Sequence, residues 1–347
     1  MKTLLGRVLL GFALLTIAVK SLATTADESL SQLYKQAKAA GQSQVVIYLP
    51  YGNLQPVWDA FTQAWPGITV RPAVISGGGA PLLARIRAEA TSGNYTGDVV
   101  ISGLGDIHTL QQEHRLEKDV PPQAASLPEQ YKDSAGYYQI PFNTLFTLVY
   151  NPNLIKPEQL PQTFDEAVSQ KNQGHFGYAR FTGAAAPDLA GSVLFWNNAV
   201  SDEQLKQIKA NGREVPTAIA LLTNIAQGRL AYGLWAPTQN VKKIQQDGAP
   251  LAIHLLKDSA VLMGPGMAML NHAPNKAAAQ LLRGWLLSDA GQRALGELAS
   301  SYGTQPGAPV PPGLPDVSDY AFKTIPLSHW EETLRAFRSH TQAIWGN

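Results

Sequence analysis

Three consecutive glycines, Gly77, Gly78 and Gly79, follow Ser76 where an apolar, alternating stretch ends and an apolar helical pattern begins. Glycine permits backbone angles that other residues avoid, and it lets a ligand approach the main chain closely. Free N–H groups at the positive end of a helix dipole bind oxyanions. The turn therefore predicts a site for a phosphonate, phosphate or carboxylate group, held by Ser76 and the glycine amides. The alternative is a tight turn in which the glycines only satisfy backbone geometry.

A second turn of this kind lies in "YARFTGAAAPDLAGS", where Thr182 and Gly183 follow a strand-like segment and precede a helical segment that begins near Pro187. Arg180 can bring a guanidinium group to an anion, and its alternative is a surface or packing role. Aromatic side chains at predicted strand ends can wall an organic ligand or contact an ammonium group. These aromatic residues are Tyr48, Tyr51, Phe142, Trp235 and Tyr302. Lobe packing is the alternative for each, and Tyr51 is favoured because it closes the first strand.

The chain lacks the residues that several kinds of chemistry require. There is no cysteine, which excludes disulfides, thiolate metal sites and cysteine nucleophiles. None of the seven histidines has the H-E-x-x-H spacing, no G-x-S-x-G is present, and no G-K-[ST] follows the glycines. A paired-carboxylate glycosidase stays open, although acidic residues are scarce at the predicted strand ends. We therefore expect a binding protein without cofactor or metal, not an enzyme.

The first 23 residues have the pattern of a secretory signal peptide. Lys2 and Arg7 precede an apolar run over residues 8–19, and Ser21-Leu22-Ala23 fits a small-x-small cleavage site. The apolar run is shorter than the roughly 20 residues that a membrane span needs. We expect export to the periplasm with cleavage near Ala23, and an uncleaved anchor is the alternative.

The charges are balanced, with 27 Lys and Arg against 26 Asp and Glu. Residues 1–23 hold three cations and no anion, so without them the net charge changes from +1 to −2. This balance lacks the basic surplus of nucleic-acid-binding proteins. We expect no nucleic acid among the partners of this protein.

The elements that must position these residues alternate between strand and helix. A strand pattern over 43–52 is followed by a helical pattern up to 65, a strand over 68–75, a helix after the glycines and a strand over 98–102. This order predicts a doubly wound α/β sheet, and ligands bind outside the carboxyl ends of such strands, where the glycine turn lies. Further strands are expected at 144–151, 176–181, 230–235, 251–256 and 260–270, the last one broken by Gly264-Pro265-Gly266.

At this point the residues resemble a known family. The stretch from "VVIYLPYGNLQPVWDAFTQAWPG" through "SGGGAPLLARIRAEA" to "DVVIS" is similar to the opening lobe of periplasmic solute-binding proteins of ABC importers, of the ferric-iron, polyamine and phosphonate types. "LVYNPNLIKPEQLPQTFDEA" is similar to the start of their second lobe, and "SDAGQ" to their late helix. The resemblance covers most of residues 43–310.

The resemblance implies a type II periplasmic-binding-protein fold, in which hinge strands join two doubly wound α/β lobes that close over a ligand. Lobe 1 is expected to comprise residues 24–140 plus 262–302, and lobe 2 residues 141–261 plus 303–347. The implied partners are a small-molecule ligand and an inner-membrane ABC permease, and the protein is expected to be a monomer.

Ferric-binding relatives use an adjacent tyrosine pair from the second lobe. Tyr137-Tyr138 is adjacent but precedes "IPFN", and residues 180–240 hold no such pair. The expected ligand is therefore a small anionic or zwitterionic organic solute, with an aminophosphonate or phosphate ester as the sharpest expectation. Ferric iron and a polyamine are alternatives, as are a periplasmic enzyme and a sensor-coupled receptor on the same scaffold. The expected ligand-binding residues are Tyr51, Ser76, Gly77, Gly78, Gly79, Ser102, Asn143, Arg180, Thr182, Gly183, Trp235 and Tyr302.

Overall fold

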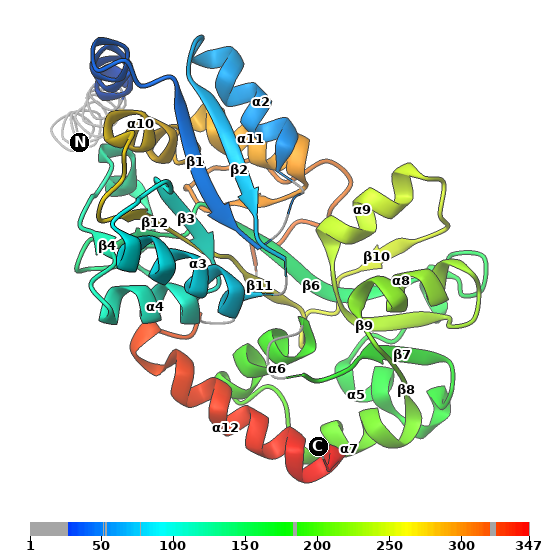
Figure 1. Cartoon of the computed structure of the whole chain (residues 1–347). Helices are drawn as coiled ribbons and strands as arrows, with labels where there is room; N and C mark the ends of the chain where they lie inside the picture. Colours follow the sequence, from blue (N-terminus) through cyan, green and yellow to red (C-terminus); the bar gives the residue numbers. More distant parts are fainter. Residues whose placement is uncertain are drawn as a thin grey trace, which may run out of the picture.

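The computed structural model describes residues 27–346 except 51, 53, 77, 183–185 and 320–323. Its strands form two sheets, which lie side by side in Figure 1 with helices packed around each. The first sheet has the order β2-β1-β3-β12-β4, with β5 paired to β12. Its strands are β1 (Gln44–Leu49), β2 (Thr69–Val74), β3 (Val99–Ser102), β4 (Leu116–Glu117), β5 (Tyr138–Gln139) and β12 (Gly266–Leu270).

In this first sheet, β1 lies parallel to both β2 and β3, while β12 is antiparallel to β3. The carboxyl ends of β1, β2 and β3 therefore meet at one edge of the sheet. β2 is an edge strand, which is why it tolerates Pro72. The helices of this lobe are a helix over 27–39, α2 (Gln55–Ala64), α3 (Gly79–Ser92), α4 (Leu104–Gln112), the 3₁₀ turns η1 (Pro122–Ser126) and η2 (Glu129–Tyr131), α10 (Lys276–Leu286) and α11 (Asp289–Ala299).

The second sheet has the order β10-β6-β9-β7-β8, and β11 and β13 also pair with β6. All nine residues of β6 are buried, as expected for a central strand with an almost continuous apolar sequence. The strands are β6 (Phe142–Tyr150), β7 (Phe176–Ala179), β8 (Arg213–Val215), β9 (Tyr232–Pro237), β10 (Ala252–His254), β11 (Val261–Met263) and β13 (Tyr302–Gly303). The helices are η3 (Pro157–Gln159), α5 (Phe164–Val168), η4 (Gln170–Asn172), α6 (Ala186–Trp196), α7 (Asp202–Asn211), α8 (Ala218–Ala226) and α9 (Thr238–Gln246).

Between its described strands, the chain passes from one sheet to the other at three points. It crosses between the end of β5 and the start of β6, and it crosses back between β11 and β12, where Gly264-Pro265 separates the two strands. It enters the second sheet again between α11 and β13. Two sheets connected in this way agree with the two-lobe α/β fold expected from the sequence. The exact lobe boundaries given above stay a prediction.

The last helix, α12 (Leu327–Trp345), packs against α6 and α7 beside the second sheet and also against α4 beside the first. Figure 1 shows it running along one side of the molecule from α4 to α7. Its buried residues include Trp330 near one end and Phe337 near the middle. The helix therefore contacts both lobes.

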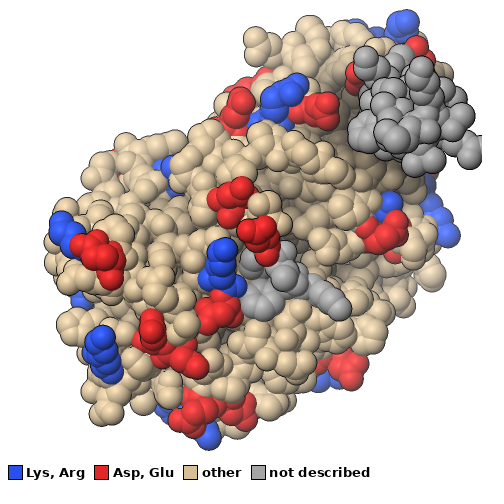
Figure 2. All heavy atoms as spheres, turned by 180° about the vertical axis from the view of Figure 1, so that it is seen from behind, with Lys and Arg blue, Asp and Glu red and all other residues tan. Residues whose placement is uncertain are grey.

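Charged side chains do not form a dominant patch of one sign on the face shown in Figure 2, where basic and acidic residues are interspersed over an uncharged surface. In the part of the chain that the structure describes, no helix combines the length and apolar character that crossing a membrane requires.

Candidate functional site

The glycine turn lies where the sequence predicted, at the carboxyl edge of the first sheet. β2 ends at Val74, and the N–H of Ile75 still donates to Leu49 O at 2.9 Å, which keeps the turn beside the end of β1. Gly78 is the N-cap of α3, with φ 85° and ψ −159°, and no side chain caps this helix. Ser76 and Gly78 are exposed, whereas Gly77 lies outside the described residues. The amides of Gly78 and Gly79 are therefore available at an uncapped helix N-terminus.

A carboxylate that the sequence analysis did not select lies against this turn. Asp106, in the first turn of α4, places its side chain where a Cβ on residue 79 would be. Ser102, which ends β3 and is fully buried, donates its hydroxyl to Asp106 Oδ2 at 2.5 Å. Burial raises the pKa of Asp106, while the Ser102 hydroxyl lowers it by less. Ser102, a predicted ligand residue, therefore holds the Asp106 carboxylate, and this carboxylate lies against Gly79 of the turn.

The second-lobe residues have partners within the protein. Arg180 Nε donates to Glu214 Oε1 at 2.7 Å in an exposed ion pair. The Thr182 N–H donates to Asp188 Oδ2 at 2.9 Å, and Asp188 is buried in the first turn of α6. Gly183 lies outside the described residues. The described contacts of Arg180 therefore match its alternative, a surface role, while Thr182 is exposed.

Trp235 lies in the core of lobe 2, not at a cleft surface. Its ring is 2% exposed and packs near Phe164 and Phe181, and its indole N–H donates to Ser259 O at 3.1 Å. Its φ is 53°, an unusual value for a strand residue other than glycine. The contacts of Trp235 therefore match lobe packing, the alternative to a role in ligand binding.

Tyr302 and Asn143 lie at the junction of the lobes. They are paired residues of β13 and β6, and both side chains are buried. The Tyr302 hydroxyl donates to Pro315 O at 2.9 Å, and burial raises the pKa of Tyr302 above its usual value. This hydrogen bond therefore holds the segment around Pro315, in the connector between β13 and α12, against Tyr302. Tyr51, the aromatic residue that the sequence favoured, lies outside the described residues.

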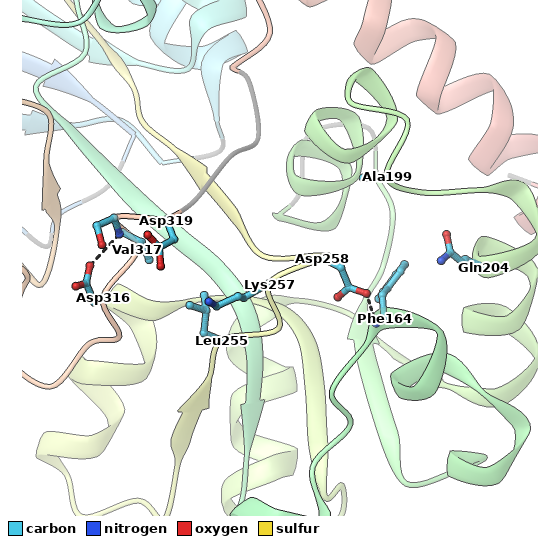
Figure 3. Close-up of a pocket in the computed structure, with 10 residues that line it drawn as sticks. Phe164, Ala199, Gln204, Leu255, Lys257, Asp258, Asp316, Val317 and Asp319 are labelled. Carbon is cyan, nitrogen blue, oxygen red and sulfur yellow. Dashed lines mark hydrogen bonds between the residues drawn. The ribbon is translucent and has the colours of Figure 1, made fainter.

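The structure contains a cavity of about 720 Å³ away from the glycine turn. Figure 3 shows that its lining comes from α5, α7, the segment between β10 and β11, and the connector before α12. Asp258 in its wall accepts the Phe164 N–H at 2.8 Å, and Asp316 accepts the Ser318 N–H at 2.8 Å. None of the predicted ligand residues that the structure describes lines this cavity.

A smaller cavity of about 150 Å³ includes one predicted ligand residue, Thr182. Its wall also holds Arg338, Gln342 and Trp345 from α12. The last helix thus reaches the second-lobe turn. Within the described residues, no three His, Asp or Glu side chains gather in a metal-binding arrangement.

A family model for bacterial extracellular solute-binding proteins matches residues 57–322. The chain belongs to this family. The match confirms the family that the sequence resembles, which consists of solute-binding proteins and not of enzymes, and whose extracellular role agrees with the expected export. A comparison with curated protein sequences found no match.

Solved structures of similar fold include iron-bound HitA from Pseudomonas aeruginosa, with a TM-score of 0.71 and 18% identity over 86% of this chain and 99% of that chain. IdiA (FutA) from Trichodesmium, in complex with iron and citrate, has a TM-score of 0.67 and 18% identity over 87% and 99%. The substrate-binding protein of an ABC transporter from Agrobacterium tumefaciens has a TM-score of 0.68 and 15% identity over 86% and 94%. These likenesses confirm the two-lobe α/β fold.

Proposed function

We propose that this member of the family is the periplasmic solute-binding component of an ABC importer, which captures a small organic solute with an anionic group and delivers it to an inner-membrane permease. The observation that carries the ligand class is the uncapped N-terminus of α3, where the exposed Gly78 has a backbone conformation that only glycine adopts readily. Main-chain amides at such a position favour an oxyanion. A phosphonate or phosphate ester has the oxygen atoms to accept from several of them.

The proposed site combines residues of both lobes. Ser76, Gly77, Gly78 and Gly79 belong to lobe 1, and Thr182 and Gly183 would approach the ligand from lobe 2 when the lobes close. Tyr51 would add an aromatic wall. Tyr51, Gly77 and Gly183 enter on sequence grounds alone.

A ligand screen tests this proposal. Purified protein is melted with phosphonates, phosphate esters, amino acids and polyamines, and each positive compound is then titrated by calorimetry. A ligand at about 100 times its Kd should stabilise the protein by about 2.7 kcal/mol, which gives a clear shift in Tm. Stabilisation by polyamines alone would contradict the anionic class. Turnover of a bound compound would instead favour an enzyme on this scaffold.

Ferric iron is the second candidate, because the structures of HitA and IdiA (FutA) that share this fold contain iron. Against it stands the lack of an adjacent tyrosine pair in residues 180–240. Titration with ferric citrate should therefore produce no tyrosinate-to-iron absorption band. A strong visible band that is lost on Tyr→Phe substitution would contradict the organic ligand and show that the protein binds ferric iron through tyrosine.

Export is the remaining part of the proposal. We infer that the mature chain begins near Thr24, after the Ser21-Leu22-Ala23 sequence. Intact-mass measurement on protein from the periplasmic fraction tests this. A mass that includes residues 1–23 would favour the uncleaved anchor.

A further inference from the structure

The three crossings of the chain between the lobes meet at the start of β6. The first two residues of β6, Phe142 and Asn143, pair with β13, which follows the third crossing. In the second crossing, between β11 and β12, a Cβ on residue 264 would collide with the carbonyl oxygen of Phe142 and lie 2.9 Å from Asn143 Oδ1. All three crossings are therefore in contact at one place, where Gly264 permits the close approach of two main chains.

On the lobe 1 side of this place, one buried side chain holds the chain before β6 and after β13. Gln292 of α11 is 2% exposed. Its Nε2 donates to Pro141 O at 2.9 Å and to Leu286 O at 2.7 Å. Its Oε1 accepts the N–H of Thr304 at 2.7 Å and the N–H of Gln305 at 3.0 Å. The carboxamide thus uses both of its donor hydrogens and both acceptor positions of its oxygen on main-chain groups.

These hydrogen bonds join three separate parts of the chain to the helices of lobe 1. Pro141 directly precedes β6, Thr304 and Gln305 directly follow β13, and Leu286 ends α10. The Thr304 hydroxyl also donates to Ile140 O at 2.7 Å, which ties the two neighbouring segments to each other. Buried main-chain groups that lose such partners are costly, so this side of the crossings should stay attached to lobe 1 during any movement.

The attachment of β6 to lobe 2 begins only a few residues further along. β6 pairs with β11 from Thr144 onward, with β9 from Phe146 and with β10 from Leu148. Phe142 and Asn143 therefore lie between a segment fixed to lobe 1 and a segment fixed to lobe 2. A hinge is a short segment of this kind, in which a few residues at the end of an element absorb the change in backbone angles.

We propose that Phe142 and Asn143, with Gly264 and β13 beside them, form the pivot of lobe movement, and that Gln292 is the positioning residue that fixes the lobe 1 side of this pivot. With Gln292 in place, the backbone can bend only between Pro141 and the first lobe 2 pairing of β6, so the lobes turn about a defined axis. Without it, bending can spread into the segments before β6 and after β13. This inference does not depend on the ligand class proposed above.

Spin-label distance measurements on the unliganded full mature protein test the role of Gln292. The chain has no cysteine, so two introduced cysteines carry the only labels. Suitable exposed positions are Gln63 in α2 of lobe 1 and Lys206 in α7 of lobe 2. The Gln292→Met substitution keeps the length of the side chain and removes its four hydrogen bonds. We expect a broader distribution of the distance between the labels in this variant than in the labelled parent.

Asn151→Leu is the matched control. The Asn151 carboxamide is also buried and bonded to main chain, since it donates to Ile225 O at 2.8 Å and accepts the Asn153 N–H at 2.9 Å, but all of these groups belong to lobe 2. Both variants should lower Tm, whereas only Q292M should broaden the distance distribution. An unchanged distribution in folded Q292M, or the same broadening in N151L, would overturn the role of Gln292.

Hydrogen exchange in the wild-type protein gives a test that needs no variant. If Gln292 holds its partners to lobe 1, the amides of Thr304 and Gln305 should exchange at least about a hundredfold more slowly than in an unstructured peptide. Exchange within about tenfold of the unstructured rate would overturn this attachment even if Q292M does not fold. Because no ligand takes part in either experiment, these outcomes do not affect the proposed function.

Discussion

Neighbouring glycines of the turn are required for different reasons. Gly78 has φ 85° and ψ −159°, and a Cβ there would contact nothing, so its backbone conformation alone demands glycine. Gly79 begins a regular helix, and it is the Asp106 carboxylate that leaves no room for a Cβ. The two positions therefore respond differently to alanine.

The Gly79→Ala substitution should displace the Asp106 side chain from Ser102. We expect a loss of about 1–2 kcal/mol in the free energy of unfolding, the range for a disturbed hydrogen bond. In a D106A background the same substitution should be neutral or slightly stabilising, because alanine favours a helix over glycine. Urea denaturation of the four proteins in this cycle measures the coupling. Equal effects of G79A in both backgrounds would show that Asp106 does not set the identity of residue 79.

The Gly78→Asp substitution should abolish binding of the anionic ligand found in the screen. The new carboxylate projects into the open space where the oxyanion is proposed to lie, and two like charges about 4 Å apart repel by about 4 kcal/mol at an effective dielectric of 20. Gly78→Ala is the control, since it shares the backbone strain of about 1–3 kcal/mol without the charge. Calorimetry on folded protein measures the affinity for the ligand. An unchanged affinity in G78D would show that the three glycines form only a turn and do not bind the ligand.

Residue-level sequence reading identified the glycine turn but not Asp106. Glycines and a following helical pattern are contiguous in the chain, so their geometry is local. Asp106 comes after the next strand, and only the parallel arrangement of β1 and β3 brings the start of α4 beside the start of α3. For Arg180 the sequence leaves a ligand role and a surface role open, because its partner Glu214 lies in β8, whose pairing with β7 is not readable from the sequence.

At the scale of elements, a buried polar network fastens the far end of α3 to the sheet. Glu89 accepts hydrogen bonds from Tyr48 of β1, from the Thr96 hydroxyl at 2.6 Å and from the Thr96 N–H at 3.0 Å. Burial opposes the charge on Glu89, but these hydrogen bonds outweigh it and lower the pKa of Glu89. Arg85 also pairs with Glu89 at 2.8 Å. The network closes the loop between α3 and β3.

The pH dependence of stability should report this network. Because the folded-state pKa of Glu89 is lowered, its ionised form stabilises the protein above the ordinary glutamate pKa of about 4.3, and this contribution is lost as the pH falls through the folded-state value. Glu89→Gln should therefore lose about 1–3 kcal/mol at pH 7, and its deficit should shrink below about pH 4. Denaturation at several pH values checks this, with Glu297→Gln as the exposed control. A deficit that does not depend on pH would assign the loss to packing alone.

The sequence predicts where an element ends when its apolar periodicity stops at a glycine or a proline. The break of the 260–270 stretch at Gly264-Pro265 was expected, and the structure places β11 and β12 in different sheets on its two sides. The arrangement of α12 was not readable, because its apolar face predicts a packed helix without saying against what. Its contacts with both lobes arise from the path of the connector fastened by Tyr302.

At the scale of the whole molecule, α12 must respond to any movement between the lobes. Its contact with lobe 1 includes Trp330, which is 4% exposed and lies close to Gly105 of α4. Its contact with lobe 2 is more extensive, with Phe337 packed on α6 and Trp345 beside Tyr178 and Phe181. Hinge motion should therefore keep α12 with lobe 2 and change the Trp330 contact.

Trp330→Ala should loosen the lobes relative to each other. The loss of this indole removes an attachment of α12 to lobe 1, so we expect a larger radius of gyration by small-angle X-ray scattering in the unliganded variant, and a return to the wild-type value with saturating ligand. Phe337→Ala is the matched control within lobe 2. Both changes should cost about 3–5 kcal/mol, the range for truncating a buried aromatic side chain. Only W330A should alter the radius, because Phe337 packs within one lobe. The same radius for W330A and wild type, without ligand, would mean that the crossing strands alone set the lobe orientation and that α12 follows them passively.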